Sequence, residues 1–68
     1  MVERIGIIGL GRMGWALAAR LATQGVEVRG WTRSGVDAAR AKADGFQVTG
    51  SLEDLVATSD VLILSLFD

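Results

Sequence analysis

The sequence predicts an α/β fold in which helices cover both faces of a parallel sheet with strand order 3-2-1-4. Expected strands and helices alternate along the chain, which implies a parallel sheet with right-handed crossovers. The first expected strand is a continuous apolar run, as is typical of a parallel strand buried on both faces. A glycine-rich turn then leads into the first helix, and with this turn on the first unit the expected order is 3-2-1-4.

Each expected element has a local signal. Strands are expected at residues 4–10, 26–32, 46–49 and 61–67, and helices at residues 12–24, 35–44 and 52–58. Gly25 and Gly45 follow the first two helices, where a left-handed residue is favoured. Ser34 and Ser51 each precede a helix and have an acid three residues later, which is the pattern of a capping box.

The packing of two helices can also be predicted. Gly14 and Ala18 form a smooth strip that would let the first helix lie close to the sheet. Trp15, on the first turn of this helix, is expected to pack in the core or at an interface rather than to contact a ligand. In the third helix, Leu55 is the residue expected to point inward.

The composition argues against several classes of function. The chain has 68 residues, 50% of them hydrophobic, with a net charge of −1 and a pI of about 5.2. It has neither cysteine nor histidine, so neither a disulfide nor a transition-metal site is expected. The charge gives no reason to expect nucleic acid or an anionic membrane as a partner. Because the chain has no apolar run of roughly 20 residues and no signal-peptide pattern, a cytoplasmic protein is expected.

The glycine-rich turn has the spacing G-x-G-x-x-G and stands between an apolar strand and a helix. Its residues are Gly9, Leu10, Gly11, Arg12, Met13 and Gly14. Gly9 would allow the tight turn, Gly11 would leave room for a pyrophosphate, and Gly14 would let the helix pack close to the strand. The N–H groups and dipole at the start of the helix favour the negative charge of the phosphates. The turn therefore predicts dinucleotide binding on a Rossmann fold.

The end of the second strand favours NADP over NAD. It reads Trp31, Thr32, Arg33 and Ser34, without the carboxylate that would accept hydrogen bonds from the ribose of NAD. The same missing acid argues against FAD. Arg33 can pair with a 2′-phosphate and stack on adenine, and the Ser34 hydroxyl can donate to the same phosphate. A solvated turn arginine and a helix N-cap are the alternative roles of these two residues.

Three apolar residues are expected beside the cofactor. Trp31 would pack next to the adenine or in the core. Leu66 and Phe67 end the fourth strand and would either wall the ribose side of the pocket or belong to the core. The pocket is expected beyond the carboxyl ends of the first and fourth strands, where the strand order reverses.

Residues 1–68 are expected to be the N-terminal portion of a longer nucleotide-binding domain. A complete Rossmann sheet has further strands after the fourth, and a chain of this length is marginally stable alone. The apolar fourth strand would otherwise be an exposed edge prone to aggregation.

These motifs resemble those of the β-hydroxyacid dehydrogenases and of the related imine reductases. That family includes 3-hydroxyisobutyrate dehydrogenase and the N-terminal domain of 6-phosphogluconate dehydrogenase. The similarity rests on residues 9–14, 18–28, 31–34 and 59–68. It implies that residues 32–34 hold the 2′-phosphate of NADP and that Leu66 and Phe67 lie near the ribose. It also implies a second, helical domain that completes a dimer, with the catalytic lysine and the substrate loop beyond residue 68.

Three residues depart from the pattern of that family. Thr32 stands in place of an asparagine, and Phe67 in place of a proline. Asp37 stands where many NADP-dependent members have a lysine, so a carboxylate near the phosphate would weaken the preference for NADP.

The function predicted is that of the NADP-binding portion of an oxidoreductase. The longer protein would transfer hydride between the nicotinamide and a small 3-hydroxy acid or an imine, as a homodimer or larger homo-oligomer. No catalytic residue is expected within the 68 residues. Two alternatives are a regulatory module that senses a dinucleotide without redox chemistry, and an isolated or designed fragment of a Rossmann fold.

Overall fold

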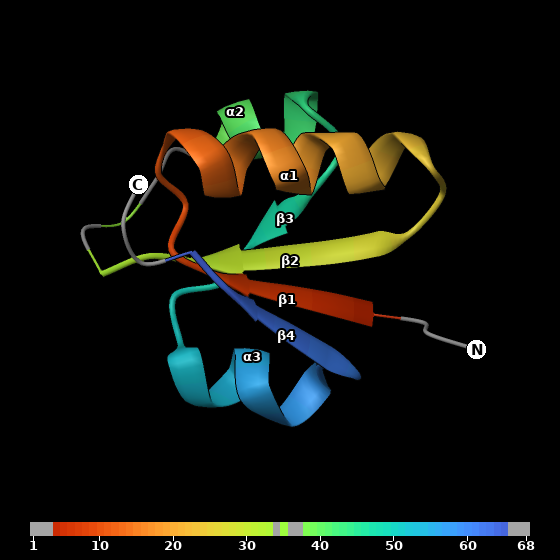
Figure 1. The fold of residues 1–68 in the computed structure, drawn as a ribbon. Coiled ribbons are helices and arrows are strands. Elements are labelled where there is room, and N and C mark those ends of the chain that lie inside the picture. Colours follow the sequence, from red (N-terminus) through yellow and green to blue (C-terminus); the bar gives the residue numbers. More distant parts are fainter. Residues whose placement is uncertain (1–3, 34, 36–37, 66–68) are drawn as a thin grey trace.

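The computed structural model describes residues 4–33, 35 and 38–65, which form a parallel sheet with helices on both faces (Figure 1). The strands are β1 (Arg4–Ile8), β2 (Glu27–Trp31), β3 (Gln47–Val48) and β4 (Val61–Leu64). They form one four-stranded sheet in the order β3-β2-β1-β4, and each neighbouring pair is parallel. The predicted α/β class and strand order are therefore confirmed.

The helices are α1 (Arg12–Thr23), α2 (Ala38–Ala43) and α3 (Leu52–Thr58). Helices α1 and α2 lie on one face of the sheet and α3 lies on the other (Figure 1). The predicted cap of α3 is present, because the Asp54 N–H donates to the Ser51 Oγ at 3.1 Å. Within the ranges that the structure describes, none of the helices is long and apolar enough to cross a membrane.

Some element boundaries differ from the prediction. Strand β1 ends at Ile8 rather than at Leu10, because Gly9 turns the chain with a φ of 100°. Gly35 was predicted to open the second helix, but it has a φ of 79° and its N–H donates to the Thr32 carbonyl oxygen at 3.2 Å. This left-handed turn cannot be part of an α-helix, so that prediction was wrong. The predicted cap Ser34 lies outside the described residues.

The main core lies between the sheet and the helices α1 and α2. It consists of six buried side chains, those of Ile7, Leu10, Ala18, Val28, Ala41 and Phe46. Trp15 packs against this cluster, and its ring meets Phe46 edge-on with the ring centroids 4.8 Å apart. The predicted packing role of Trp15 is confirmed.

The small residues of α1 let this helix lie directly on the turn that precedes it. Gly14 and Ala18 are both buried. A Cβ added to Gly14 would lie 2.0 Å from the Gly9 carbonyl oxygen, so that no other residue fits without a shift of the backbone. The predicted close approach is thus confirmed, and it fixes the start of α1 against the end of β1.

The second face of the sheet is covered by α3 within the described ranges. Leu55 is fully buried there, as predicted. A Cβ added to Gly6 of β1 would lie 3.1 Å from the Leu55 Cδ1, which shows how closely α3 approaches the sheet. Along β4, the side chains of Val61, Leu62 and Leu64 are exposed, in agreement with the apolar edge expected there.

Replacing Gly14 with alanine should lower the free energy of unfolding by about 1–3 kcal/mol, as at other overpacked positions. Alanine normally stabilises a helix relative to glycine. A decrease in the free energy of unfolding would therefore indicate the clash of the added Cβ with the Gly9 carbonyl oxygen. Urea unfolding monitored by circular dichroism measures it. The control is Gly50→Ala, because a Cβ there meets no atom within 4 Å. Equal losses in both variants would contradict the close approach.

Replacing Ser51 with alanine should cost about 1 kcal/mol of stability, because the Asp54 N–H then loses the acceptor that caps α3. Ser51→Asp should retain most of the stability, since a carboxylate also accepts at this position. The same urea experiment compares both variants with the original chain. A Ser51→Ala chain as stable as the original would show that this cap contributes nothing.

Candidate functional site

The candidate site lies at the edge of the sheet that is formed by the carboxyl ends of the strands. Here β1 leads into the glycine-rich turn, and β2 leads into its connection with α2. Ligands of parallel α/β sheets bind at this edge, where the strand order reverses, and here the reversal falls between β1 and β4. The Gly9 N–H donates to the Trp31 carbonyl oxygen at 2.7 Å, and the Ser65 N–H donates to that of Ile8 at 2.8 Å. The turn is therefore anchored beside both neighbouring strands.

The start of α1 has the properties of an anion-binding site. Its N-cap is Gly11, which offers no side-chain cap, and its first turn contains no acid. The first hydrogen bond of the helix runs from the Trp15 N–H to the Gly11 carbonyl oxygen at 2.9 Å. The N–H groups of Arg12 and Met13 precede it and have no acceptor within the helix. The positive end of α1 thus lacks the compensation that a capping side chain or an acid would supply.

Helix α3 of the same chain shows the contrast. Its N-cap Ser51 accepts a hydrogen bond from the Asp54 N–H, and both Glu53 and Asp54 lie in its first turn. The Ser51 hydroxyl thus accepts a hydrogen bond from a first-turn N–H group, and the two acids offset the positive potential at the start of α3. Among the described residues, the chain therefore caps α3 with its own side chains, whereas no side chain caps α1.

The side chains of the glycine-rich turn point in different directions. Leu10 is 6% exposed and packs into the core, where a Cβ added to Gly30 would meet its Cδ1 at 2.6 Å. Met13 is 72% exposed, and Arg12 is exposed as well. Of the residues predicted to bind the cofactor, Leu10 can therefore offer only its backbone, whereas Arg12 and Met13 can offer backbone and side chain.

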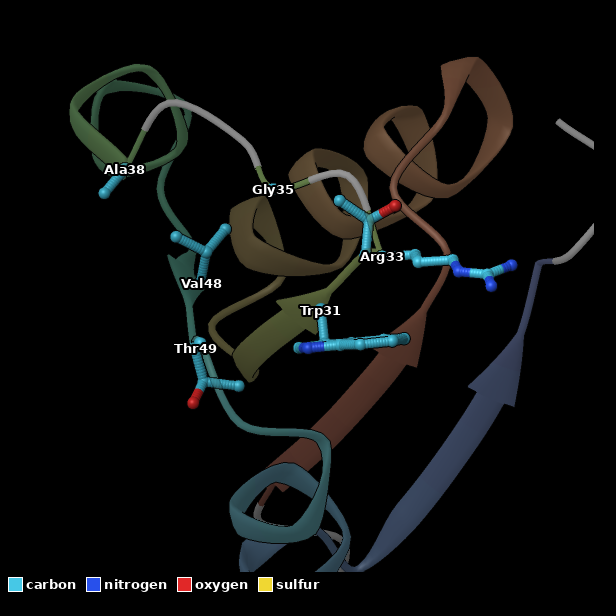
Figure 2. A pocket seen from close by; sticks show the side chains of 8 residues that line it. Trp31, Arg33, Gly35, Ala38, Val48 and Thr49 are labelled. Carbon is cyan, nitrogen blue, oxygen red and sulfur yellow. The ribbon is translucent and has the colours of Figure 1, made fainter.

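The end of β2 borders a cavity of about 550 Å³. Its lining residues are Trp31, Thr32, Arg33, Gly35, Ala38, Val48, Thr49 and Gly50 (Figure 2). Trp31 and Thr32 are half-buried and Arg33 is exposed. Figure 2 shows the Arg33 side chain extending away from Ala38 and Val48. The structure thus brings three of the predicted residues into one hollow.

The analysis of the sequence missed the contribution of β3 to this hollow. Val48 and Thr49 line it because β3 is the neighbour of β2, with Gly30 opposite Val48. The Thr49 N–H also donates to the Gly30 carbonyl oxygen at 3.0 Å, which fixes the loop after β3 beside the end of β2. The predicted strand order contained this signal, since it placed the end of β3 next to that of β2.

Three of the predicted cofactor residues, Ser34, Leu66 and Phe67, lie outside the described residues, as does Asp37. Within the described ranges, no group of three or more acidic side chains is placed so that it could hold a metal ion. The chemistry that the described site offers is therefore that of amide donors, hydroxyls and guanidinium groups around an anion.

Known proteins show the same architecture over nearly the whole chain. An imine reductase from Myxococcus stipitatus in complex with NADP+ matches 97% of the chain with a TM-score of 0.85 and 26% identity. The 3-hydroxyisobutyrate dehydrogenase of Mycobacterium tuberculosis matches 97% with a TM-score of 0.83 and 38% identity. An NADPH-dependent reductive aminase from Aspergillus oryzae is 32% identical over all 68 residues. The chain spans 23% of the length of each of these proteins.

Residues 4–68 match the family model of the NAD binding domain of 6-phosphogluconate dehydrogenase. The match includes the glycine-rich turn, the end of β2 and all of β4, and it confirms the resemblance found in the sequence. The similar structures place imine reductases and 3-hydroxyisobutyrate dehydrogenase close to this fold. The chain therefore belongs to the family of NAD(P)-binding domains that includes that of 6-phosphogluconate dehydrogenase.

Proposed function

We propose that this chain binds NADP and forms the cofactor-binding portion of an oxidoreductase. The observation that carries the proposal is the uncapped start of α1, which follows the glycine-rich turn and lies beside a β2 end with Arg33 and no acid. A dinucleotide offers two anionic groups at matching places. Its pyrophosphate suits the start of α1, and its 2′-phosphate suits the end of β2.

The pyrophosphate is bound by the backbone at the start of α1. The N–H groups of Arg12 and Met13 donate to its oxygens, and Gly11 has no side chain to keep the phosphates away. Gly9 shapes the turn, and the buried Gly14 holds the helix in place beneath it. Leu10 supports the turn from the core.

The preference for NADP comes from the end of β2. Arg33 pairs with the 2′-phosphate through its planar guanidinium, and Thr32 and Ser34 supply hydroxyl groups. Trp31 walls the adenosine side, and Leu66 and Phe67 complete the pocket after β4. The related reductive aminase is described as NADPH-dependent, and the related imine reductase is described in complex with NADP+. NAD is the alternative cofactor.

The longer protein transfers hydride between the nicotinamide and a small 3-hydroxy acid or an imine. These two substrate classes rest on the related 3-hydroxyisobutyrate dehydrogenase and imine reductase. The cofactor supplies the redox chemistry, and this chain binds and orients it. Because the chain spans 23% of the length of these relatives, the groups that bind the substrate and transfer protons are proposed to lie outside it, in a homodimer or larger assembly.

Replacing Arg33 with alanine should weaken NADPH binding by about 1.5–3 kcal/mol, the scale of hydrogen bonds to charged groups. NADH binding should barely change, because NADH has no 2′-phosphate. Isothermal titration of both cofactors measures the difference.

The control for this experiment is Arg20→Ala, which removes an exposed arginine from the last turn of α1, far from the glycine-rich turn. It should leave both affinities unchanged. Equal losses of NADPH and NADH binding in Arg33→Ala would show that Arg33 does not read the 2′-phosphate.

A further inference from the structure

A second cavity, of about 290 Å³, lies beside the start of α1 on the side of α2. Its lining residues are Leu10, Gly11, Arg12, Trp15 and Arg40. Two of them are arginines, and none of the described lining residues is an acid. The dipole of α1 adds a third source of positive potential, because Gly11 is the N-cap of this helix and Arg12 is its first residue. An anion in the cavity would face two guanidinium groups and the positive end of α1.

Arg40 is held at this cavity by an aromatic platform. Its guanidinium carbon lies 4.7 Å from the centroid of the Trp15 ring, within the range of a cation–π contact. The Trp15 Nε1 donates to the Asp44 Oδ2 at 2.6 Å, and the ring also packs edge-on against Phe46. The hydrogen bond to Asp44 and the contact with Phe46 hold the Trp15 ring in place. The ring in turn keeps the guanidinium of Arg40 next to the glycine-rich turn.

The position of the cavity indicates which phosphate it would meet. The pyrophosphate is assigned to the N–H groups of the first turn of α1, which borders the cavity through Gly11 and Arg12, whereas Arg40 borders the cavity from α2. The adenosine half of the cofactor lies on the same side, because Arg33 stands at the β2 end that leads into α2. The anion that remains on the adenosine half of NADP is the 2′-phosphate.

We propose that Arg40 is a second residue that binds the 2′-phosphate of NADP, and that Trp15 is its positioning residue. The proposal deepens the function proposed above and rests on it. Arg33 and Arg40 would then approach the same phosphate from the end of β2 and from α2. The selectivity for NADP would depend on the packing of α1 against α2, as well as on the residues that follow β2.

The test uses adenosine 2′,5′-bisphosphate and adenosine 5′-monophosphate as probes, since they differ only in the 2′-phosphate. Titration calorimetry on the 68-residue chain gives both affinities. Arg40→Gln should weaken binding of the bisphosphate about tenfold and leave the monophosphate unchanged. The matched control is Lys42→Gln, a cation in the last turn of the same helix that does not line this cavity. This control should change neither affinity.

Two variants of Trp15 test its positioning role. Trp15→Leu removes the ring and should reduce the preference for the bisphosphate as Arg40→Gln does. Trp15→Phe keeps an aromatic face under Arg40 and should restore part of that preference. The preference is a ratio of two affinities, so a general loss of folded protein would not move it, and circular dichroism measures the folded fraction.

The outcomes separate this inference from the function on which it rests. If Arg33→Ala removes the preference for the bisphosphate and Arg40→Gln does not, the role of Arg40 is refuted and NADP binding stands. If Arg40→Gln and Lys42→Gln have equal effects, or if Arg40→Gln weakens both probes equally, Arg40 does not read the 2′-phosphate. If the original chain does not distinguish the probes, the proposed preference for NADP itself fails.

Discussion

The contact on which the rest of the structure depends is the approach of α1 to the turn that precedes it. The helix starts so close to β1 that its Gly14 lies against the Gly9 carbonyl oxygen, at a distance that excludes any side chain. This contact determines where the first turn of α1 stands relative to the carboxyl ends of the strands. The buried Leu10 and Ala18 then continue the same contact into the core. The first-turn amides of α1 are thus positioned by packing, and no flexible side chain has to hold them.

The two helix starts on opposite faces of the sheet show how stability and function are divided. Helix α3 begins with a capping serine and two acids, which stabilise it with groups from its own sequence. Helix α1 begins with a glycine and an arginine, so that neither a capping side chain nor an acid of its first turn offsets its positive potential. A start of this kind costs stability in the absence of a ligand and favours the bound state when an anion is present. The longer helix tolerates this because its buried strip packs on the sheet.

Trp15 connects the candidate site with the core between the helices. Its ring makes a T-shaped contact with Phe46, its Nε1 donates to Asp44, and its face supports Arg40. Trp15, in the first turn of α1, therefore contacts Arg40 of α2 as well as Asp44 and Phe46, which follow α2. On this view, a change in the packing of α2 would alter the charge around the cofactor without changing any residue of the glycine-rich turn.

The sequence by itself determined the α/β class, the strand order, the glycine-rich turn, the cap at Ser51 and the missing acid after β2. These features depend on apolar runs and on residues a few positions apart, which a linear pattern records directly. Only the tertiary structure decided that Gly35 forms a turn, that the Leu10 side chain packs on Gly30 in the core, that Thr49 lies beside the end of β2, and that Arg40 lies over Trp15. These placements follow from the register between strands and from the packing of one helix against another, and both join residues that are distant in the chain.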